Sequence, residues 1–409
     1  MFINSLNNFN IRNSDLETEF CEYSKHATLP GIIIMFIVCI PFVAVLSYDL
    51  FQLYFYDGYG FTIAYVGSFL AIMLCLIGSH FRFPLQSIKT YAYILFALGY
   101  CVLSAILIHS GYRYIGVVMN TMGVVAVLSH CKLKKSTIWI TFILLMVTGL
   151  ICSFTVGGYY TSQVRGKSVN SNYVALFGVT VLVYGNGMLC HLRKKETWKI
   201  QLLRLLLVGI SFYIIWECQS RGSLLAWLFY TVCVYVLPAS IFRNKKKVMI
   251  IALLIAITGV VFTYFYVTKL PGLISTFMGK STATRFRLWS YFWDIIFDND
   301  KNMLLGYGTH SELRELFGYG LHNIYIGIWH DIGLIGLVIF ILFILLSLRD
   351  TFNVENNLSI AQLYFIVGFL TFMVSDFFAI TFTGPMVVWN YALLGLARTA
   401  KLDENKRYR

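Results

Sequence analysis

Long apolar runs recur along this chain, and they constrain its fold more than any other feature. Each run has about 18–22 residues, enough for one helix to cross a hydrocarbon core of roughly 30 Å. Asp, Glu, Lys and Arg make up only 12% of the 409 residues, whereas soluble proteins carry about 25%. The sequence therefore predicts an all-α, polytopic membrane protein. A membrane β-barrel would instead show alternating segments of about ten residues.

The apolar runs predict about twelve transmembrane helices, and merging or splitting runs changes this count by one or two. The predicted spans are residues 31–48, 61–79, 91–109, 114–129, 137–156, 172–190, 201–218, 222–239, 248–268, 332–348, 358–375 and 384–397.

The distribution of Lys and Arg predicts how these spans are oriented. With both chain ends in the cytoplasm, 22 of the 32 Lys and Arg fall in cytoplasmic segments, as the positive-inside rule requires. The chain then divides into residues 1–268 with spans one to nine, a large outer loop at 269–331 with short helices of its own, and residues 332–409 with spans ten to twelve and a cytoplasmic tail. Because the basic residues cluster between spans, the net charge of +13 does not indicate nucleic acid as a partner.

The ten cations left on the outer side call for another explanation. They include Arg165 and Lys167 before span six, Arg221 between spans seven and eight, and Arg285, Arg287 and Arg314 in the large loop. Basic side chains at the outer surface bind phosphate through charge-assisted hydrogen bonds. The alternative is that they snorkel to lipid headgroups and have no further function.

Two of these arginines have specific surroundings. Arg221 follows Glu217 by four residues, so on a continuous helix the two would pair as an internal lock. Without that pairing, an arginine between two apolar runs indicates a functional site. Arg285 shares a helix face with Trp289, so ring contact would hold the guanidinium while its fork stays available for phosphate. An Arg/Trp pair of the interfacial belt is the alternative.

His322 and Asn323 are the candidate pair for proton chemistry. A histidine that titrates near neutral pH can accept a proton from an attacking hydroxyl, although a structural histidine at the start of the next helix explains the position equally well. Asn172 is a helix-start residue, and its amide could also face a sugar. The chain has no CxxC or Cys/His metal spacing, P-loop or GxSxG elbow, so the sequence predicts neither metal nor cofactor.

Several short motifs, in their order and spacing, resemble the O-antigen ligase and O-antigen polymerase superfamily. They are Ser220-Arg221-Gly222 at a helix start, Arg285 four residues before Trp289, Gly306-Tyr-Gly308, His322-Asn323 and Gly333-Leu-Ile-Gly336. Val169-Asn-Ser-Asn172-Tyr-Val-Ala175 resembles the Asn-Tyr-x-Ala element of the family. Asn-Ser stands before Asn172 where Asp-Pro is common, which weakens the assignment of that residue.

The resemblance implies a multi-pass protein of the bacterial inner membrane that transfers a glycan, without metal, at a periplasmic site. The donor would be an oligosaccharide on undecaprenyl diphosphate, with membrane lipid and a chain-length regulator protein as further candidate partners. By motif, Arg221 and Arg285 would bind the diphosphate and His322 would activate the acceptor hydroxyl. Residues expected to assist in substrate binding are Arg287, Arg165, Lys167, Asn172, Asn323 and Arg314.

The acceptor decides between two activities. A ligase delivers the glycan to lipid A–core, and a polymerase delivers it to another lipid-linked repeat unit. The shared motifs concern the common donor, and polymerase is favoured only because polymerases are the more numerous and divergent members. A transporter of lipid-linked saccharides is the third alternative, against which the lack of a visible internal repeat counts modestly.

Overall fold

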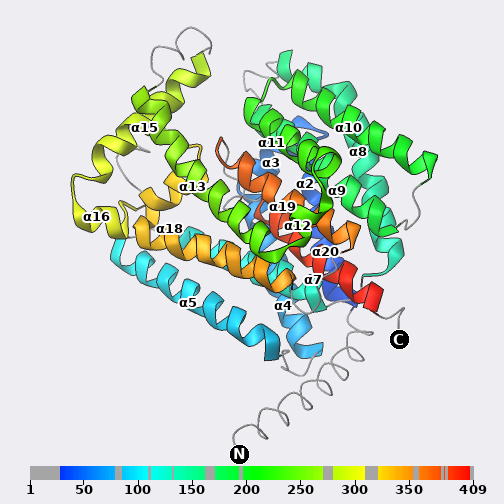
Figure 1. The fold of residues 1–409 in the computed structure, drawn as a ribbon, viewed down its shortest axis with the longest axis horizontal. Helices are drawn as coiled ribbons and strands as arrows, with labels where there is room; N and C mark the ends of the chain where they lie inside the picture. Colours follow the sequence, from blue (N-terminus) through cyan, green and yellow to red (C-terminus); the bar gives the residue numbers. More distant parts are fainter. Residues whose placement is uncertain are drawn as a thin grey trace, which may run out of the picture.

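The computed structural model describes residues 28–78, 85–108, 112–130, 133–161, 171–192, 197–269, 280–308, 321–352, 359–378, 382 and 386–405. Every regular element within these ranges is a helix, which confirms the all-α prediction (Figure 1). Six of the described helices are long and apolar enough to cross a membrane, and further apolar helices of 10–17 residues accompany them. The count of twelve spans and the side on which residues 269–331 lie stay predictions.

The first half of the chain contains α2 (Thr28–Ala44), α3 (Tyr48–Phe55), α4 (Tyr59–Gly78), α5 (Leu85–Ile108), α6 (Tyr112–Thr121), the π-helical turn η1 (Met122–Ala126), α7 (Val127–His130), α8 (Lys135–Thr161) and α9 (Ser171–Leu192). The second half contains α10 (Trp198–Glu217), α11 (Arg221–Thr231), the π-helical turn η3 (Val232–Val236), α12 (Ala239–Arg243), α13 (Lys245–Lys269), α15 (Lys280–Ile296), α16 (Asp300–Leu305), α18 (Ile324–Thr351), α19 (Ile360–Ser375) and α20 (Val387–Asn405).

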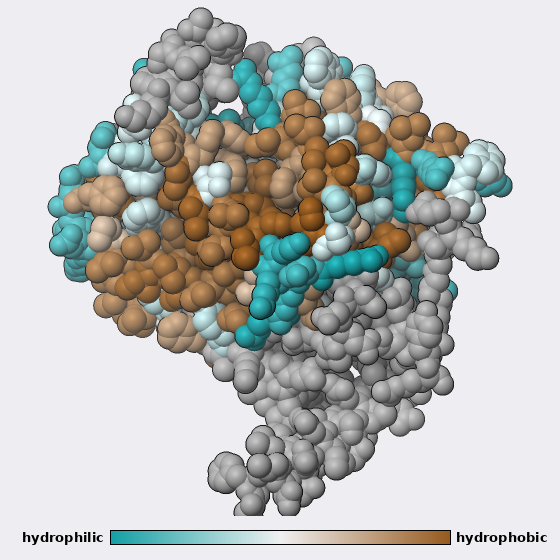
Figure 2. All heavy atoms as spheres, in the orientation of Figure 1, coloured by the Kyte–Doolittle hydropathy of each residue, from teal (hydrophilic) through white to brown (hydrophobic). Residues whose placement is uncertain are grey.

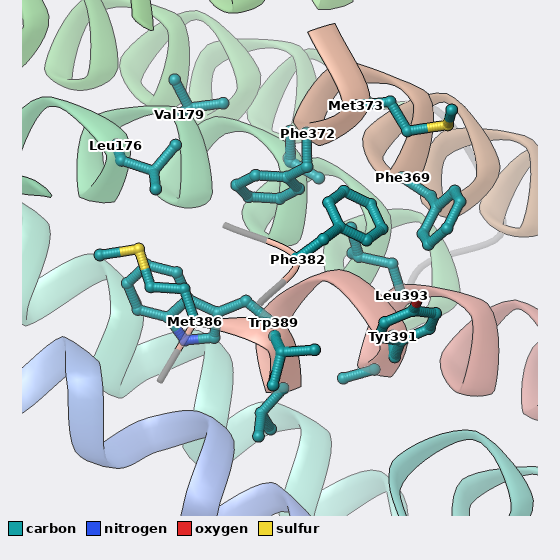
Figure 3. Close-up of a cluster of buried hydrophobic side chains, with 14 of the residues drawn as sticks. Leu176, Val179, Phe369, Phe372, Met373, Phe382, Met386, Trp389, Tyr391 and Leu393 are labelled. Carbon is teal, nitrogen blue, oxygen red and sulfur yellow. The ribbon is translucent and has the colours of Figure 1, made fainter. Parts of the chain in front are cut away.

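The core of the molecule is built around α9, α19 and α20. The apolar window of α9 is 89% buried, whereas those of α4, α10 and α13 are 28–33% buried. Figure 3 shows how Phe369 and Phe372 of α19 pack toward Trp389 and Tyr391 of α20. The less buried helices expose large apolar side chains such as Leu205, and Figure 2 shows a broad hydrophobic surface on the face where α5, α13 and α18 lie in Figure 1. Such a surface suits contact with lipid.

The short helices predicted within residues 269–331 are present in the described part of that segment as α15 and α16. Asn299 caps α16 by accepting a hydrogen bond from the backbone N–H of Lys301 at 2.9 Å. The turn after α16 uses Gly306 and Gly308, whose φ angles of 92° and 88° belong to the left-handed region.

α18 is broken near its first third, at the boundary between the predicted loop and span ten. Ile332 and Gly333 leave the helical conformation, and Gly333 has φ 76° and ψ 176°. A Cβ at Gly333 would lie 2.1 Å from the carbonyl oxygen of Leu304, so only glycine allows the end of α16 to approach this closely. The first part of α18, residues 324–331, is therefore a separate short helix fixed at one end by the α16 turn.

Candidate functional site

Arg221 is placed by the break between α10 and α11. Gln219 adopts a left-handed conformation with φ 50° and ends α10, and Ser220 then precedes the first turn of α11. Glu217 and Arg221 consequently lie on different helices, and no ion pair joins them in the described structure. The internal lock considered above is absent, and Arg221 is exposed at the start of α11.

Arg285 of α15 contacts the turn that follows α19. Its guanidinium carbon lies 5.5 Å from the ring centroid of Phe378, and one of its Nη atoms lies 3.5 Å from the Phe378 carbonyl oxygen. The ring that holds Arg285 is therefore Phe378 rather than Trp289. The same phenylalanine touches the start of α11, because a Cβ at Gly222 would lie 2.8 Å from the Phe378 Cβ. Phe378 thus contacts both arginine-bearing segments.

Trp289 connects α15 to the histidine segment. Its indole N–H donates a hydrogen bond of 2.7 Å to the carbonyl oxygen of Leu321, the residue before His322. The Trp289 ring is fully buried and packs edge-on against Tyr266 of α13, with ring centroids 5.0 Å apart. Tyr266 interacts electrostatically with both Arg221 and Arg285, so its hydroxyl lies in the neighbourhood of both guanidinium groups.

His322 has an unusual backbone conformation that its neighbours maintain. Its φ of 52° is in the left-handed region, which costs a non-glycine residue about 1–3 kcal/mol. Asn323 is fully buried and accepts hydrogen bonds from the N–H groups of Tyr325 and Ile326. Asn323 therefore caps α18, and the adjacent His322 does not. Strain at a residue that is clamped on both sides is a frequent property of functional positions.

The three predicted catalytic residues share one electrostatic environment. Burial lowers the pKa of Arg285, the Arg221 charge lowers it further, and Tyr266 acts in the opposite direction. Burial also lowers the pKa of His322 from 6.5 to about 4, with the Arg285 charge as the second cause. The imidazole is therefore neutral at pH 7. The positive charges of Arg221 and Arg285 therefore interact near a neutral imidazole. A bound anion would stabilise this arrangement, because it offsets the repulsion between the two guanidinium groups.

The predicted substrate-binding residues are placed differently. Asn172 lies beside the Arg221 segment, because the Ser220 hydroxyl donates to its Oδ1 at 3.0 Å. Arg287 is exposed, two residues beyond Arg285 on α15. Asn323 is buried, and its Nδ2 donates to the carbonyl oxygens of Gly259 and Phe377 at 2.9 and 3.3 Å. Arg165, Lys167 and Arg314 lie outside the described residues.

The acidic residues near the site do not form a metal centre in the described part of the chain. Asp298 and Asp300 have the D-x-D spacing of many metal-dependent nucleotide-sugar transferases, but they are exposed and flank the Asn299 cap of α16. No group of three or more His, Cys, Asp or Glu side chains is close enough to hold a metal ion within the described residues.

The sequence interpretation missed two of the residues that hold this site together. Phe378 and Tyr266 are aromatic residues in or beside apolar helices, so their positions look like ordinary core. Trp289 was predicted to hold Arg285, and it donates to the Leu321 carbonyl instead. Asp376 is the C-cap of α19, and its carbonyl oxygen accepts from the N–H of Ile324 at 3.1 Å. The sequence feature that could have indicated this turn is the pair Phe377-Phe378 directly after Asp376, the residue that ends α19.

The comparison with known families covers the central part of the chain. Residues 205–341 match a family model described as O-antigen ligase. This similarity supports the resemblance to the O-antigen ligase and polymerase superfamily that the motifs indicate. The match contains Arg221, Arg285 and His322, whereas Asn172 and the Phe378 turn lie outside it. No curated protein matches the chain.

Proposed function

We propose that this protein is a surface-polysaccharide polymerase of the bacterial inner membrane. In this proposal it transfers a glycan from an undecaprenyl-diphosphate donor to a second lipid-linked repeat unit, at a periplasmic site and without metal. The observation that carries the proposal is the shared environment of Arg221, Arg285 and His322. Arg221 begins α11, Arg285 lies on α15, and His322 lies just before α18; 63 residues separate the first two in sequence and 36 the last two.

The chemistry requires an acceptor hydroxyl to attack C1 of the donor sugar. The C1–O bond to the diphosphate breaks, the lipid diphosphate leaves with the bonding electrons, and the hydroxyl proton passes to His322. Negative charge grows on the leaving group as this bond breaks. Fixed guanidinium groups of Arg221 and Arg285 stabilise that charge more in the transition state than in the ground state, and this difference is what accelerates the reaction.

The low pKa of His322 in the free protein fits this sequence of events. A bound diphosphate neutralises the Arg285 charge that disfavours the imidazolium. The pKa of His322 then rises, so the imidazole becomes a stronger base when the donor is present. Asn323 serves this residue by fixing the start of α18, because its amide is engaged by the protein on both sides.

The charge distribution on the helices supports a periplasmic orientation. α10 begins with Lys199 in its first turn and ends near Arg221, and α13 begins with Lys245, Lys246 and Lys247 and ends near Tyr266. Their basic ends therefore lie away from the site. By the positive-inside rule these ends belong in the cytoplasm, which leaves the site on the opposite face.

The ligase is the second candidate, and the description of the matched family favours it. A gene deletion in the host cell followed by glycan analysis separates the two. A single repeat unit attached to lipid A–core identifies a polymerase. Full-length glycan that accumulates on the lipid carrier identifies a ligase. An unchanged glycan profile in the deletion strain contradicts both.

A transporter would use the same cations for binding but would have no need of a base. Complementation of the deletion with Arg221→Lys and His322→Asn tests this difference. We expect both variants to fail, because Lys cannot form the bidentate contacts of Arg and Asn cannot accept the proton. Normal glycan with His322→Asn contradicts the transferase and favours the transporter.

A further inference from the structure

The C-terminal turn of α19 carries contacts that the proposed chemistry leaves unexplained. This turn comprises Asp376, Phe377 and Phe378, and it lies 35 or more positions beyond the end of the family match at residue 341. Asp376 and Phe378 donate their N–H groups to Phe372 and Ser375 within the end of the helix. Their carbonyl oxygens point beyond the last turn, where a helix has no partners of its own for them.

The three carbonyl oxygens accept hydrogen bonds from two parts of the site. The Asp376 oxygen accepts from the N–H of Ile324 at 3.1 Å, and the Phe377 oxygen accepts from Asn323 Nδ2 at 3.3 Å. The Phe378 oxygen lies 3.5 Å from Arg285 Nη2. The first two contacts fix the segment that begins with His322, and the third fixes a guanidinium group. The negative end of the α19 dipole also favours the Arg285 charge.

The Phe378 side chain provides the remaining contact. Its ring lies under the Arg285 guanidinium and packs edge-on against Phe262 of α13, with ring centroids 5.7 Å apart. Its Cβ leaves no room for a side chain at Gly222, so the position of Phe378 limits where the start of α11 can lie. Phe378 therefore contacts both the Arg285 guanidinium and Gly222, the neighbour of Arg221.

We propose that Phe378, through its ring and the carbonyls of its turn, is a positioning residue that sets the spacing of Arg221 and Arg285 for a diphosphate. This inference rests on the proposed function and names a residue from outside the matched family region. Phe378 touches neither substrate nor reacting atoms in this role. It acts through Arg285 and through Gly222, the neighbour of Arg221.

The test compares variants of the full-length protein in nanodiscs, with undecaprenyl diphosphate as the binding probe. We expect Phe378→Ala to weaken binding about 3- to 30-fold, the range of a cation–π contact. Phe378→Leu restores volume without the ring and should remain weak, whereas Phe378→Tyr keeps the ring and should bind almost normally. Gly222→Ala should weaken binding too, because the new Cβ displaces Phe378.

The matched control is Phe365→Ala on α19, the helix that Phe378 follows. Phe365 is 1% exposed and lies on α19 well before its end at Ser375, about 15 Å from that end along the axis. It should lower the melting temperature as Phe378→Ala does and leave probe affinity unchanged. Equal affinities for Phe378→Ala and Phe365→Ala overturn the positioning role.

Arg285→Ala, measured in the same series, separates the two hypotheses. If Arg285→Ala loses binding while Phe378→Ala retains it, the positioning role is wrong and the proposed function stands. If Arg285→Ala binds the probe like the unchanged protein, the proposed function itself is wrong.

Discussion

The two ends of the short helix at residues 324–331 contrast in nearly every physical respect. At one end, His322 is partly exposed, held in a left-handed conformation and placed beside Arg285. At the other end, His330 is 2% exposed, its Nδ1 lies 3.0 Å from Asp331 Oδ1, and its ring stacks on Tyr307 with centroids 5.6 Å apart. One histidine faces a positive site, and the other is enclosed by an acid and an aromatic ring.

This difference indicates a division of roles along one helix. The His330 end is fixed by its neighbours: Tyr114 donates to Asp331 Oδ2 at 3.0 Å, and the N–H of Tyr307 donates to the His330 carbonyl at 2.7 Å. The Asp331 carboxylate and the His330 carbonyl there are used for internal bonds. A rigid anchor about two turns away allows the His322 end to hold a strained conformation.

The largest expected effect is the difference in glycan transfer between variants of the two histidines. We expect His322→Ala to lower glycan transfer about 100- to 10,000-fold, the usual contribution of a general base, with normal amounts of folded protein. We expect His330→Ala to keep normal transfer per folded molecule. Transfer is measured from glycan ladders, and folded protein from detergent-resistant thermal melting. Equal losses for both variants would remove the proposed division of roles.

The second-largest expected effect is the loss of transfer when Arg285, the cation beside His322, is removed. Arg285→Ala should lower transfer about 100- to 1,000-fold, the typical cost of one fixed donor to a developing oxyanion. Arg287, exposed two residues further along α15, should give a clearly smaller loss as Arg287→Ala. The comparison uses initial rates at saturating acceptor. If Arg287→Ala lowers transfer as much as Arg285→Ala does, the substrate binds on the other face of α15.

The anchor end should respond through stability. Gly333→Ala places a Cβ 2.1 Å from the Leu304 oxygen at a position with positive φ, so we expect at least about 3 kcal/mol of destabilisation or failure to accumulate. Gly209→Ala is the control, because nothing lies within 4 Å of a Cβ there. The measurement is the yield and melting temperature of the purified protein. A Gly333→Ala protein as stable as Gly209→Ala would show that the break is not tightly packed.

Removing the acid at the anchor has a smaller expected cost. Asp331→Asn keeps the shape but weakens the bonds to His330 and Tyr114, so we expect about 1–3 kcal/mol of lost stability. Transfer by the remaining folded protein should be normal. A selective loss of transfer at unchanged stability would instead assign Asp331 a part in the reaction.

The pH dependence is the finest test at the reactive end. A base must be neutral, so activity is present above its pKa and is lost as pH falls through it. In the free protein the pKa of His322 is about 4, so the acid limb of kcat/KM should lie near pH 4. The acid limb of kcat should lie at higher pH, because the bound diphosphate raises the pKa of His322. Coincident limbs would mean that donor and imidazole do not interact.

The sequence was informative about the helices and about the residues that carry charge. Apolar runs predict most helices because lipid and core both select apolar side chains, and scarce charges such as Arg221 and Arg285 are conspicuous among them. The same logic conceals the supporting contacts. Phe378 resembles any aromatic residue of an apolar segment, and the break at Gly333 lies inside an apolar run. These features depend on three-dimensional packing between separate segments: Gly333 meets Leu304, and Arg285 meets Phe378, 93 positions away in sequence.

The most direct test of the central claim is the pKa of His322 in the full-length protein in nanodiscs, followed by NMR of labelled histidine and assigned with His322→Asn. The account predicts that undecaprenyl diphosphate raises this pKa from its low free value, and that Arg285→Ala raises it without ligand. A pKa that responds neither to the diphosphate nor to the loss of Arg285 would contradict a shared site of guanidinium groups and imidazole.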